Sequence, residues 1–417
     1  MIKKVLISDN RKKVFFNAFA LFVIQGVDYI LPLLLFPYLV HTLGIELFGL
    51  LAFSTATVAF LGAIVSYGFN LSGTQQIAIN KANKNKIDEI FNSIILVKLI
   101  LLIISFFILL LMTTFIDRIA TDKEVFFATF LLVVGEAIFP IWFFQGIEKM
   151  KFITYFRIGY KLLYAISIFI FVKSAEDYLL VPLLNGIGAI LSGVVALFLI
   201  RKKFDVVFKF QKTLSIIFQF QNSWHIFISQ IAGHFYVTIN IFVLGMLSTN
   251  ENVGYYSLAF KVYQAFRGLL KPVNQALFPF LSKKYIKNKT AYYKLVKQIS
   301  MIYVSVLVVL SVLLSLFSQE IIRLLAGVDI PESSELLQIF SITILFAVGS
   351  FFTSLLIIKL KSKKLSKITF YTMILNMVMV YPVITLYDIY GLAYLVLLTQ
   401  VFQAFLQVKY NKEIWKK

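Results

Sequence analysis

One strongly apolar stretch of this chain carries a row of cationic and amide side chains at helical spacing. At about 100° per residue, every charged or amide residue between positions 261 and 277 falls within an arc of about 140°. An ionisable side chain inside a membrane costs roughly 2.5–3.5 kcal/mol unless it faces protein or water. The arc therefore predicts a watery groove that favours anions, unless Lys271 and Arg267 extend to the cytoplasmic interface instead. Its members are Lys261, Gln264, Arg267, Lys271, Asn274 and Gln275.

Three other apolar stretches have milder polar faces. The face in residues 14–40 comprises Asn17, Gln25, Asp28 and Pro32. The face in residues 47–71 consists of small or polar side chains, which also suit a seam of close packing between helices. It comprises Thr55, Ala59, Gly62, Ser66 and Asn70. The face in residues 223–247 comprises Ser223, Gln230, His234 and Thr238.

Two ionisable residues stand out inside these stretches. Asp28 lies about midway along the apolar stretch 14–40, with Gln25 on the same face. A carboxylate at that depth requires a partner, and the cations of the arc are the obvious candidates. His234 is interpreted either as a hydrogen-bonded structural residue or as a proton carrier.

Four more ionisable residues have two interpretations each. Lys98, Arg157 and Lys161 lie near the cytoplasmic ends of their stretches, so they either extend to the interface or have a function. Glu136 lies one turn before Pro140 without an identifiable partner. The stretch 139–146 is expected to close its membrane segment at the cytoplasmic face, as a simple terminus or as a gate, with Trp142 as an interfacial anchor.

The composition explains why these stretches are interpreted as membrane spans. The 417 residues are 60% hydrophobic and 14% charged, too few polar residues to cover a soluble protein of this size. No cysteine is present, which excludes disulfides and thiolate chemistry. Backbone groups in hydrocarbon must bond internally, so each stretch is predicted to be a helix. The twelve stretches are 14–40, 47–71, 91–115, 125–146, 153–173, 178–200, 223–247, 253–280, 295–317, 335–358, 368–388 and 391–409.

The distribution of basic residues orients these twelve spans. With a cytoplasmic N-terminus, 32 of the 40 Lys and Arg fall on the cytoplasmic side and four on the other. Because cytoplasmic loops collect Lys and Arg, this asymmetry predicts that both termini lie in the cytoplasm. It also explains the net charge of +20, so no nucleic-acid partner is needed to account for that charge. The short loops leave no room for a catalytic domain.

The longest cytoplasmic connection divides the chain into two lobes of six helices. The predicted domains are residues 1–200, a linker at 201–222, and residues 223–417. The linker is expected to be either an interfacial amphipathic helix or an extension of the next span. A weak internal repeat, LVHTLGIELFGLLAF at 39–53 and FVLGMLSTNENVGYYSLAF at 242–260, supports the division.

Five ordered motifs give the chain a resemblance to a known family over essentially its whole length. They are PYLVHTLGIELFG (37–49), YGFNLSGTQQIA (67–78), FPIWFFQGIEKM (139–150), GYYSLAFK (254–261) and NQALFPFLSK (274–283). The chain resembles the Wzx-type O-antigen flippases of the superfamily that also contains multidrug extruders and lipid II flippases. One departure is Gln75 and Gln76, where a more basic pair is expected. The resemblance implies a V-shaped pair of lobes in the bacterial inner membrane, with spans one, two, seven and eight lining a central cavity.

The function implied by this resemblance is lipid flipping without catalysis. The cargo is expected to be a polyprenyl-diphosphate-linked oligosaccharide, moved to the outer leaflet by alternating access. The cations Lys261, Arg267 and Lys271 are expected to hold the diphosphate. No cofactor or metal is expected beyond proton or sodium coupling, for which Asp28 and His234 are candidates. A polysaccharide polymerase and chain-length machinery are the expected partners. The residues expected to bond the sugar are Gln264, Asn274, Asn70 and Gln25.

Two alternatives differ in cargo or in class. An exporter of the same fold could carry lipid II, a teichoic-type glycan or a cationic drug, although a site for cationic drugs should be acidic. A membrane-embedded glycan polymerase or acyltransferase would need a catalytic base, and no paired acids or metal-spaced histidines occur.

Overall fold

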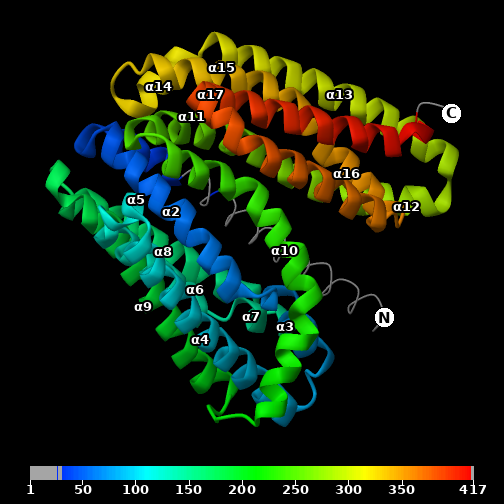
Figure 1. Cartoon of the computed structure of the whole chain (residues 1–417). Coiled ribbons are helices and arrows are strands. Elements are labelled where there is room, and N and C mark those ends of the chain that lie inside the picture. The colour runs from blue at the N-terminus through cyan, green and yellow to red at the C-terminus, as the bar shows by residue number, and fades with distance from the viewer. Residues whose placement is uncertain (1–25, 27–30, 415–417) are drawn as a thin grey trace. The chain divides into compact units, whose positions relative to one another are not determined.

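The computed structural model describes Gly26 and residues 31–414, without the side chains of 229, 232–237 and 362, and all regular structure in this part of the chain is helical (Figure 1). A first helical segment spans Leu31–Leu43. The helices that follow are α2 (Ile45–Ser66), α3 (Phe69–Ile79), α4 (Lys84–Phe115), α5 (Asp117–Ala120), α6 (Lys123–Ile138), α7 (Ile141–Gly146), α8 (Met150–Phe171), η1 (Ala175–Leu179) and α9 (Leu180–Phe204). The remainder are α10 (Thr213–Leu247), α11 (Asn250–Gly268), α12 (Leu270–Lys287), α13 (Lys289–Leu316), α14 (Ser318–Ala326), α15 (Pro331–Leu345), η2 (Phe346–Val348), α16 (Gly349–Ile358), α17 (Ser362–Tyr410) and η3 (Lys412–Ile414).

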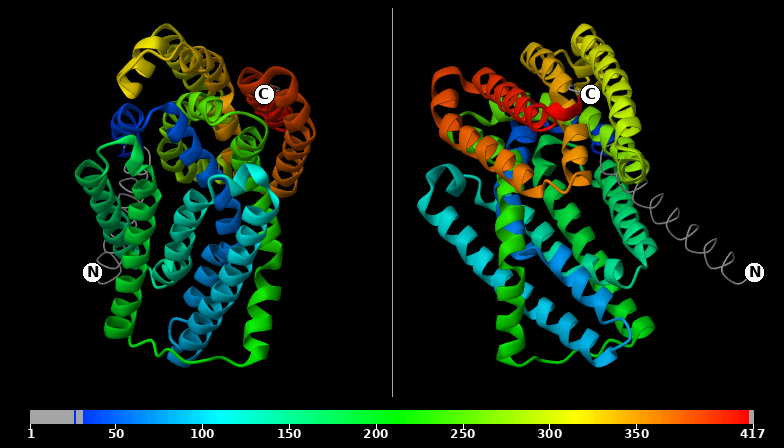
Figure 2. Two further views of the ribbon diagram at one scale, coloured as in Figure 1. Left: turned by 60° about the vertical axis from the view of Figure 1, so that its left-hand side comes forward. Right: turned by 90° about the vertical axis from the view of Figure 1, so that its right-hand side faces the viewer.

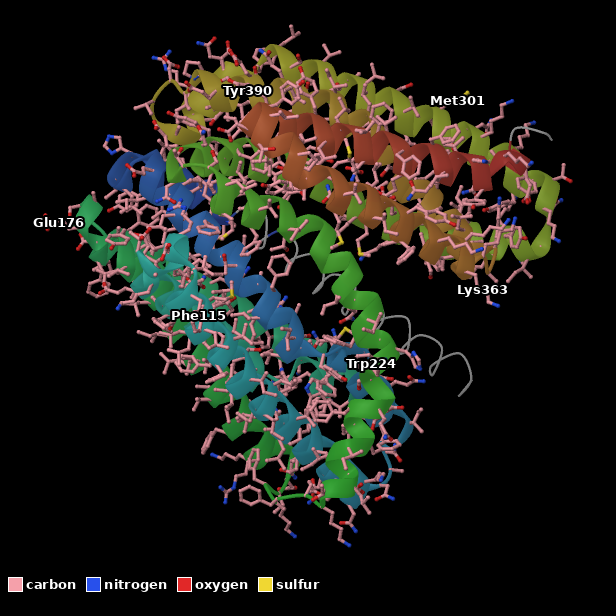
Figure 3. The ribbon with its side chains drawn as sticks, viewed as in Figure 1. Phe115, Glu176, Trp224, Met301, Lys363 and Tyr390 are labelled. Atoms are coloured by element: carbon pink, nitrogen blue, oxygen red, sulfur yellow. The ribbon has the colours of Figure 1, made fainter. Side chains whose placement is uncertain are left out.

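Eight helical segments of the described chain are long and apolar enough to cross a membrane. The last of them contains a break at Asp388, where φ is 46° and ψ is −131°, between the predicted spans 368–388 and 391–409. The outer faces are apolar, as at Met301 on α13, which is 52% exposed (Figure 3). The protein is therefore a multi-pass membrane protein. The count of twelve spans and the cytoplasmic placement of the termini stay predictions.

The chain forms two compact units. One contains Ser54–His234 together with the described residues before Phe36, and the other contains Phe36–Phe53 and the chain from Phe235 onward. All three boundaries fall inside helical segments, namely Leu31–Leu43, α2 and α10, which each contribute to both units. In the first unit α6 lies along α9, and in the second α15 lies against α11, α13 and α17 (Figures 1 and 2). The predicted domains 1–200, 201–222 and 223–417 stay a prediction.

The two repeated sequence segments pack against each other within the second unit. A Cβ atom on Gly49 would lie 1.8 Å from the Asn250 carbonyl oxygen, and one on Gly254 would lie 2.2 Å from the Ile45 carbonyl oxygen. Asn250 lies 205 positions after Ile45, and Gly254 lies 205 positions after Gly49, so the two pairs are equivalent in the repeat. The same backbone contact is therefore made twice with the roles exchanged, as in a two-fold related pair.

The linker between α9 and α10 is not helical over residues 205–212, so this part of it is not an amphipathic helix. It is fixed to α4 by the buried Asn92, whose Nδ2 donates to the Val207 carbonyl at 2.8 Å and whose Oδ1 accepts from the Lys209 N–H at 3.2 Å. α10 begins at Thr213, so the second half of the linker is part of the next helix. This agrees with the expectation that the linker extends the next span. At about 1.5 Å per residue its 35 residues exceed the hydrocarbon thickness of about 30 Å.

The end of the described chain is held by a charged cluster. Glu413 accepts from Lys361 Nζ at 2.6 Å and from Lys359 Nζ at 3.4 Å, and the Tyr293 hydroxyl donates to it at 3.1 Å. Lys359 is fully buried and also donates to Asn411 Oδ1 at 3.2 Å. The hydrogen bond from Lys361 is the main reason that the pKa of Glu413 falls to about 2.

This cluster should make stability fall at acidic pH. Because the pKa of Glu413 is lower in the folded chain than its ordinary value of 4.5, its contribution is present above pH 4.5 and is lost as the pH falls towards 2. The carboxylate is 43% exposed, so solvent screening leaves about 1 kcal/mol. Glu413→Gln should lower the melting temperature of the purified protein at pH 7. It should also make the melting temperatures at pH 7 and pH 3 more similar than they are in the wild-type protein. Glu176→Gln, at an exposed carboxylate (Figure 3), should change neither the melting temperature nor its pH dependence. Equal effects of the two variants would contradict the stabilising role of Glu413.

Candidate functional site

The segment predicted as one continuous span, 253–280, is two helices. α11 ends at Gly268 and α12 begins at Leu270. Pro272 has no N–H for the Gly268 carbonyl, and its ring crowds that carbonyl, so the helix bends there. The prediction of one uninterrupted helix over 253–280 is therefore wrong, whereas the shared arc of its polar residues stays a prediction. Lys261, Gln264 and Arg267 lie on α11, whereas Lys271 and Asn274 lie on α12.

Lys261 is held by two aromatic rings. Its Nζ lies 4.6 Å from the centroid of Phe36 and 4.8 Å from that of Phe48, and the two rings meet edge to face. Both rings are buried, whereas Lys261 is half-buried. Among the described residues no carboxylate lies within ion-pair distance of its Nζ. A cation over aromatic faces away from water gains about 2 kcal/mol, so the rings fix the ammonium group without neutralising it.

Asn274 belongs to a polar cluster with Ser350 and Tyr303, on the other side of the helix break from Arg267. Asn274 Nδ2 donates to Ser350 Oγ at 3.0 Å, and the Tyr303 hydroxyl lies 3.4 Å from the same oxygen. Arg267 interacts electrostatically with Tyr303. Asn274 Oδ1 is buried without a hydrogen-bond partner among the described residues. The cluster therefore combines two hydroxyls with the buried amide of Asn274, and Arg267 acts on it electrostatically.

The position of this cluster follows from helix breaks. Ser350 lies one residue after the start of α16, where η2 interrupts the path from α15, and its hydroxyl donates to the Ala347 carbonyl at 2.8 Å. Tyr303 on α13 stacks on Phe351 with ring centroids 5.5 Å apart. Helix interruptions bring backbone and short side chains together at membrane depth, where they bind polar groups.

For the other predicted site residues, the structure gives their helix and their exposure. Gln264 is half-buried on α11, and Lys271 is exposed on α12. Asn70 is half-buried on α3 in the other unit, where its carbonyl accepts from the Thr74 hydroxyl at 2.7 Å. Outside the described residues lie Gln25, Asp28 and the side chain of His234.

Sequence reasoning missed four residues of this region: Phe36, Phe48, Tyr303 and Ser350. The two phenylalanines gave no signal, because the chain contains 44 phenylalanines. Pro272, four residues after Gly268, was a visible signal of the bend. It would have separated Lys271 from Arg267 and directed attention to neighbours of the bend.

Comparison with known proteins identifies the family. The family model described as "Polysaccharide biosynthesis protein" matches residues 14–285. The chain belongs to this family. It is also 30% identical over 387 residues to a protein of Escherichia coli (strain K12) named "Putative O-antigen transporter", covering 92% of this chain and 93% of that one. A protein of the same name from Shigella dysenteriae is 30% identical over 390 residues, covering 92% and 96%. These matches confirm the resemblance to Wzx-type flippases, a group of transporters rather than enzymes.

Two solved structures share the fold of this family member. The lipid II flippase MurJ in an inward closed conformation gives a TM-score of 0.71 at 15% identity, covering 95% of this chain and 87% of that one. An inward-facing multidrug transporter of the MATE family gives 0.71 at 15% identity, covering 96% and 98%. At such identity the likeness concerns the fold alone, which is that of polytopic helical transporters.

Proposed function

We propose that this family member flips a polyprenyl-diphosphate-linked oligosaccharide, an O-antigen or similar surface-polysaccharide unit, across the bacterial inner membrane. Lys261, Arg267 and Lys271 bind the diphosphate, and Gln264 and Asn274 bind sugar hydroxyls. Asn70 and Gln25 complete the sugar site from the N-terminal lobe. Twelve spans with cytoplasmic termini alternate access between the two leaflets. A polysaccharide polymerase and its chain-length partners receive the cargo, and a proton or sodium gradient, with Asp28 and His234 as candidates, drives it.

One observation carries this proposal: within residues 31–414 the ammonium group of Lys261 is fixed by two rings and has no carboxylate within ion-pair distance. A lysine that only stabilised the fold would be expected to pair with a carboxylate, because a buried unpaired charge costs several kcal/mol. Among the described residues Lys261 contacts rings instead of an acid, which leaves its charge available to an anion. Arg267 adds a planar donor that suits the paired oxygens of a diphosphate.

Substitution of Lys261 tests the proposal directly. In a strain that lacks its own flippase and depends on this protein, Lys261→Gln should reduce surface glycan at least about tenfold, because one charge contact with phosphate is worth about 1.5–3 kcal/mol. Lys261→Arg should keep most of the export, since arginine also stacks on aromatic rings. Glycan on the cell surface is measured at equal protein level.

The cargo is tested in the same strain. Expression of the wild-type chain should restore surface glycan and leave resistance to cationic dyes unchanged. Dye resistance that rises while surface glycan stays absent would favour a drug exporter. Full export by Lys261→Gln would contradict the proposed role of this lysine.

A further inference from the structure

The apolar segment that ends at Gly146 is broken in its middle. α6 ends at Ile138, α7 begins at Ile141, and Phe139 and Pro140 between them have non-helical backbone angles. Since Pro140 has no N–H, the carbonyl of Glu136, four residues earlier, receives no intrahelical hydrogen bond. A carbonyl released inside a membrane span needs another donor or a cation.

Lys98 on α4 supplies that donor. Its Nζ donates to the Glu136 carbonyl oxygen at 2.9 Å, and the lysine is only 4% exposed. The ammonium also interacts electrostatically with the Glu136 side chain. Exposed residues of α4 such as Ile103 and Phe107 are apolar and suit lipid, whereas Lys98 points away from them. The interpretation that Lys98 extends to the cytoplasmic interface is therefore wrong.

The Glu136 side chain is exposed even though α6 belongs to a membrane span. It lies beside α2, because a Cβ atom on Gly62 would be 3.9 Å from Glu136 Oε2. Gly62 belongs to the small and polar face of α2, on which Thr55 and Ala59 are also exposed. An ionised carboxylate is unstable against acyl chains, so this shared face indicates contact with water.

Among the described helices that pack against α6, the charged side chain that contacts Glu136 is that of Lys98. α9 packs against the same end of α6 with Ala189 and Ile190, and neither α3 nor α7 contains a charged residue. α8 reaches this end through the contact of Phe156 with Phe139. The charged residues elsewhere on the neighbouring elements are Glu46 on α2, Lys84, Lys86, Asp88 and Glu89 on α4, Asp117 and Arg118 on α5, Lys151, Arg157 and Lys161 on α8, Glu176 and Asp177 on η1, and Arg201, Lys202 and Lys203 on α9.

α7 connects this break to the rest of its unit. Trp142 on α7 is fully buried between Phe91 and Gly73, so the expectation that it anchors at the membrane interface is wrong. The Thr74 hydroxyl of α3 donates to Gln145 Oε1 at 3.1 Å. α7 therefore links the break both to α3 and to the buried Trp142.

We propose that Glu136 is a proton-binding site that couples this transporter to a proton gradient, with Lys98 as its positioning residue. The ionised carboxylate balances the buried ammonium group. A proton on Glu136 removes that balance, and an uncompensated buried ammonium costs several kcal/mol. The protonated state therefore favours an arrangement in which Lys98 reaches water and α7 moves. A sodium ion at the released carbonyl would lie against the ammonium and be repelled, so the geometry favours a proton.

Proton binding can be measured without cargo, so its failure is distinct from failure of the proposed function. Purified protein in lipid nanodiscs is titrated while infrared difference spectra record carboxylic-acid formation. The expected result is one protonation step that is missing in Glu136→Gln and present in Glu124→Gln, an exposed glutamate on the same helix. In a Trp224→Phe/Trp415→Phe background, the fluorescence of Trp142 should follow the same step.

A second variant keeps the test decisive if Glu136→Gln does not fold. Lys98→Gln removes the buried ammonium group whose charge the carboxylate balances, so the fluorescence of Trp142 should no longer follow carboxylic-acid formation. A Trp142 signal that still follows carboxylic-acid formation in Lys98→Gln, or an unchanged set of steps in folded Glu136→Gln, would overturn the proposal. So would a Trp142 signal that responds to sodium and not to pH.

Discussion

Arg267→Ala should abolish export of the surface glycan, with a loss of about 100-fold or more at normal protein level. The arginine supplies a charge that is always present and a fork of donors for a diphosphate, and truncating one partner of such a contact costs about 2–5 kcal/mol. Arg267→Lys keeps the charge but not the fork, so an intermediate loss of about tenfold is expected. Glycan is measured on whole cells, and the protein is quantified in the same membranes.

The neighbours of Arg267 provide the matched control. Tyr303→Phe removes the hydroxyl near Ser350 Oγ and leaves the ring stacked on Phe351. If Arg267 acted only by bracing this cluster, Tyr303→Phe and Arg267→Ala should impair export to a similar degree. Full export in a folded Arg267→Ala protein would remove the arginine from the diphosphate site.

Gly49→Ala should unfold the second unit or lower its stability by about 3 kcal/mol or more. The added methyl group would lie 1.8 Å from the Asn250 carbonyl oxygen and 2.6 Å from the Gly254 nitrogen, both backbone atoms. Neither can move aside without separating α2 from α11. The measurement is the melting temperature and monodispersity of purified protein.

The chain contains a control for this substitution. Gly159 lies within α8, and a Cβ atom on it would have no neighbour within 4 Å. Gly159→Ala should therefore be neutral or stabilise the protein by up to about 1 kcal/mol, since alanine is the better helix former. Gly254→Ala should resemble Gly49→Ala, and the double variant should lose less than the sum because both methyl groups separate the same helices. Equal stability of the Gly49 and Gly159 variants would contradict the close contact between the repeats.

The sequence predicted the membrane-spanning helices better than their interruptions. Apolar runs of span length require helices, and the described segments follow them because hydrocarbon permits little else. The breaks at Pro140 and Pro272 were predicted as continuous helix. A proline leaves the carbonyl four residues earlier without its N–H donor. Whether the helix bends there depends on which other group donates a hydrogen bond to that carbonyl. At Glu136 that group is Lys98, which is 38 positions away in the sequence and invisible to any local pattern.

The candidate site was predictable in its chemistry and not in its geometry. Counting residues on a helix placed Arg267 and Asn274 on one side. In the structure Asn274 bonds to Ser350, and Arg267 interacts electrostatically with Tyr303. That count assumed a straight helix, so it could not place Lys271 beyond the bend. Helical periodicity identifies residues on the same helix, whereas the rings around Lys261 come from segments more than 200 residues earlier.

Binding of the charged lipid itself tests the central proposal most directly. Purified protein in nanodiscs is titrated with polyprenyl diphosphate and with the uncharged polyprenol of the same length, by fluorescence or native mass spectrometry. The diphosphate should bind at least about tenfold more tightly, less so at high salt, and the Lys261→Gln/Arg267→Gln double variant should bind both lipids equally. Equal affinity of the wild-type protein for the two lipids, or an undiminished preference in the double variant, would contradict a cationic diphosphate site on α11.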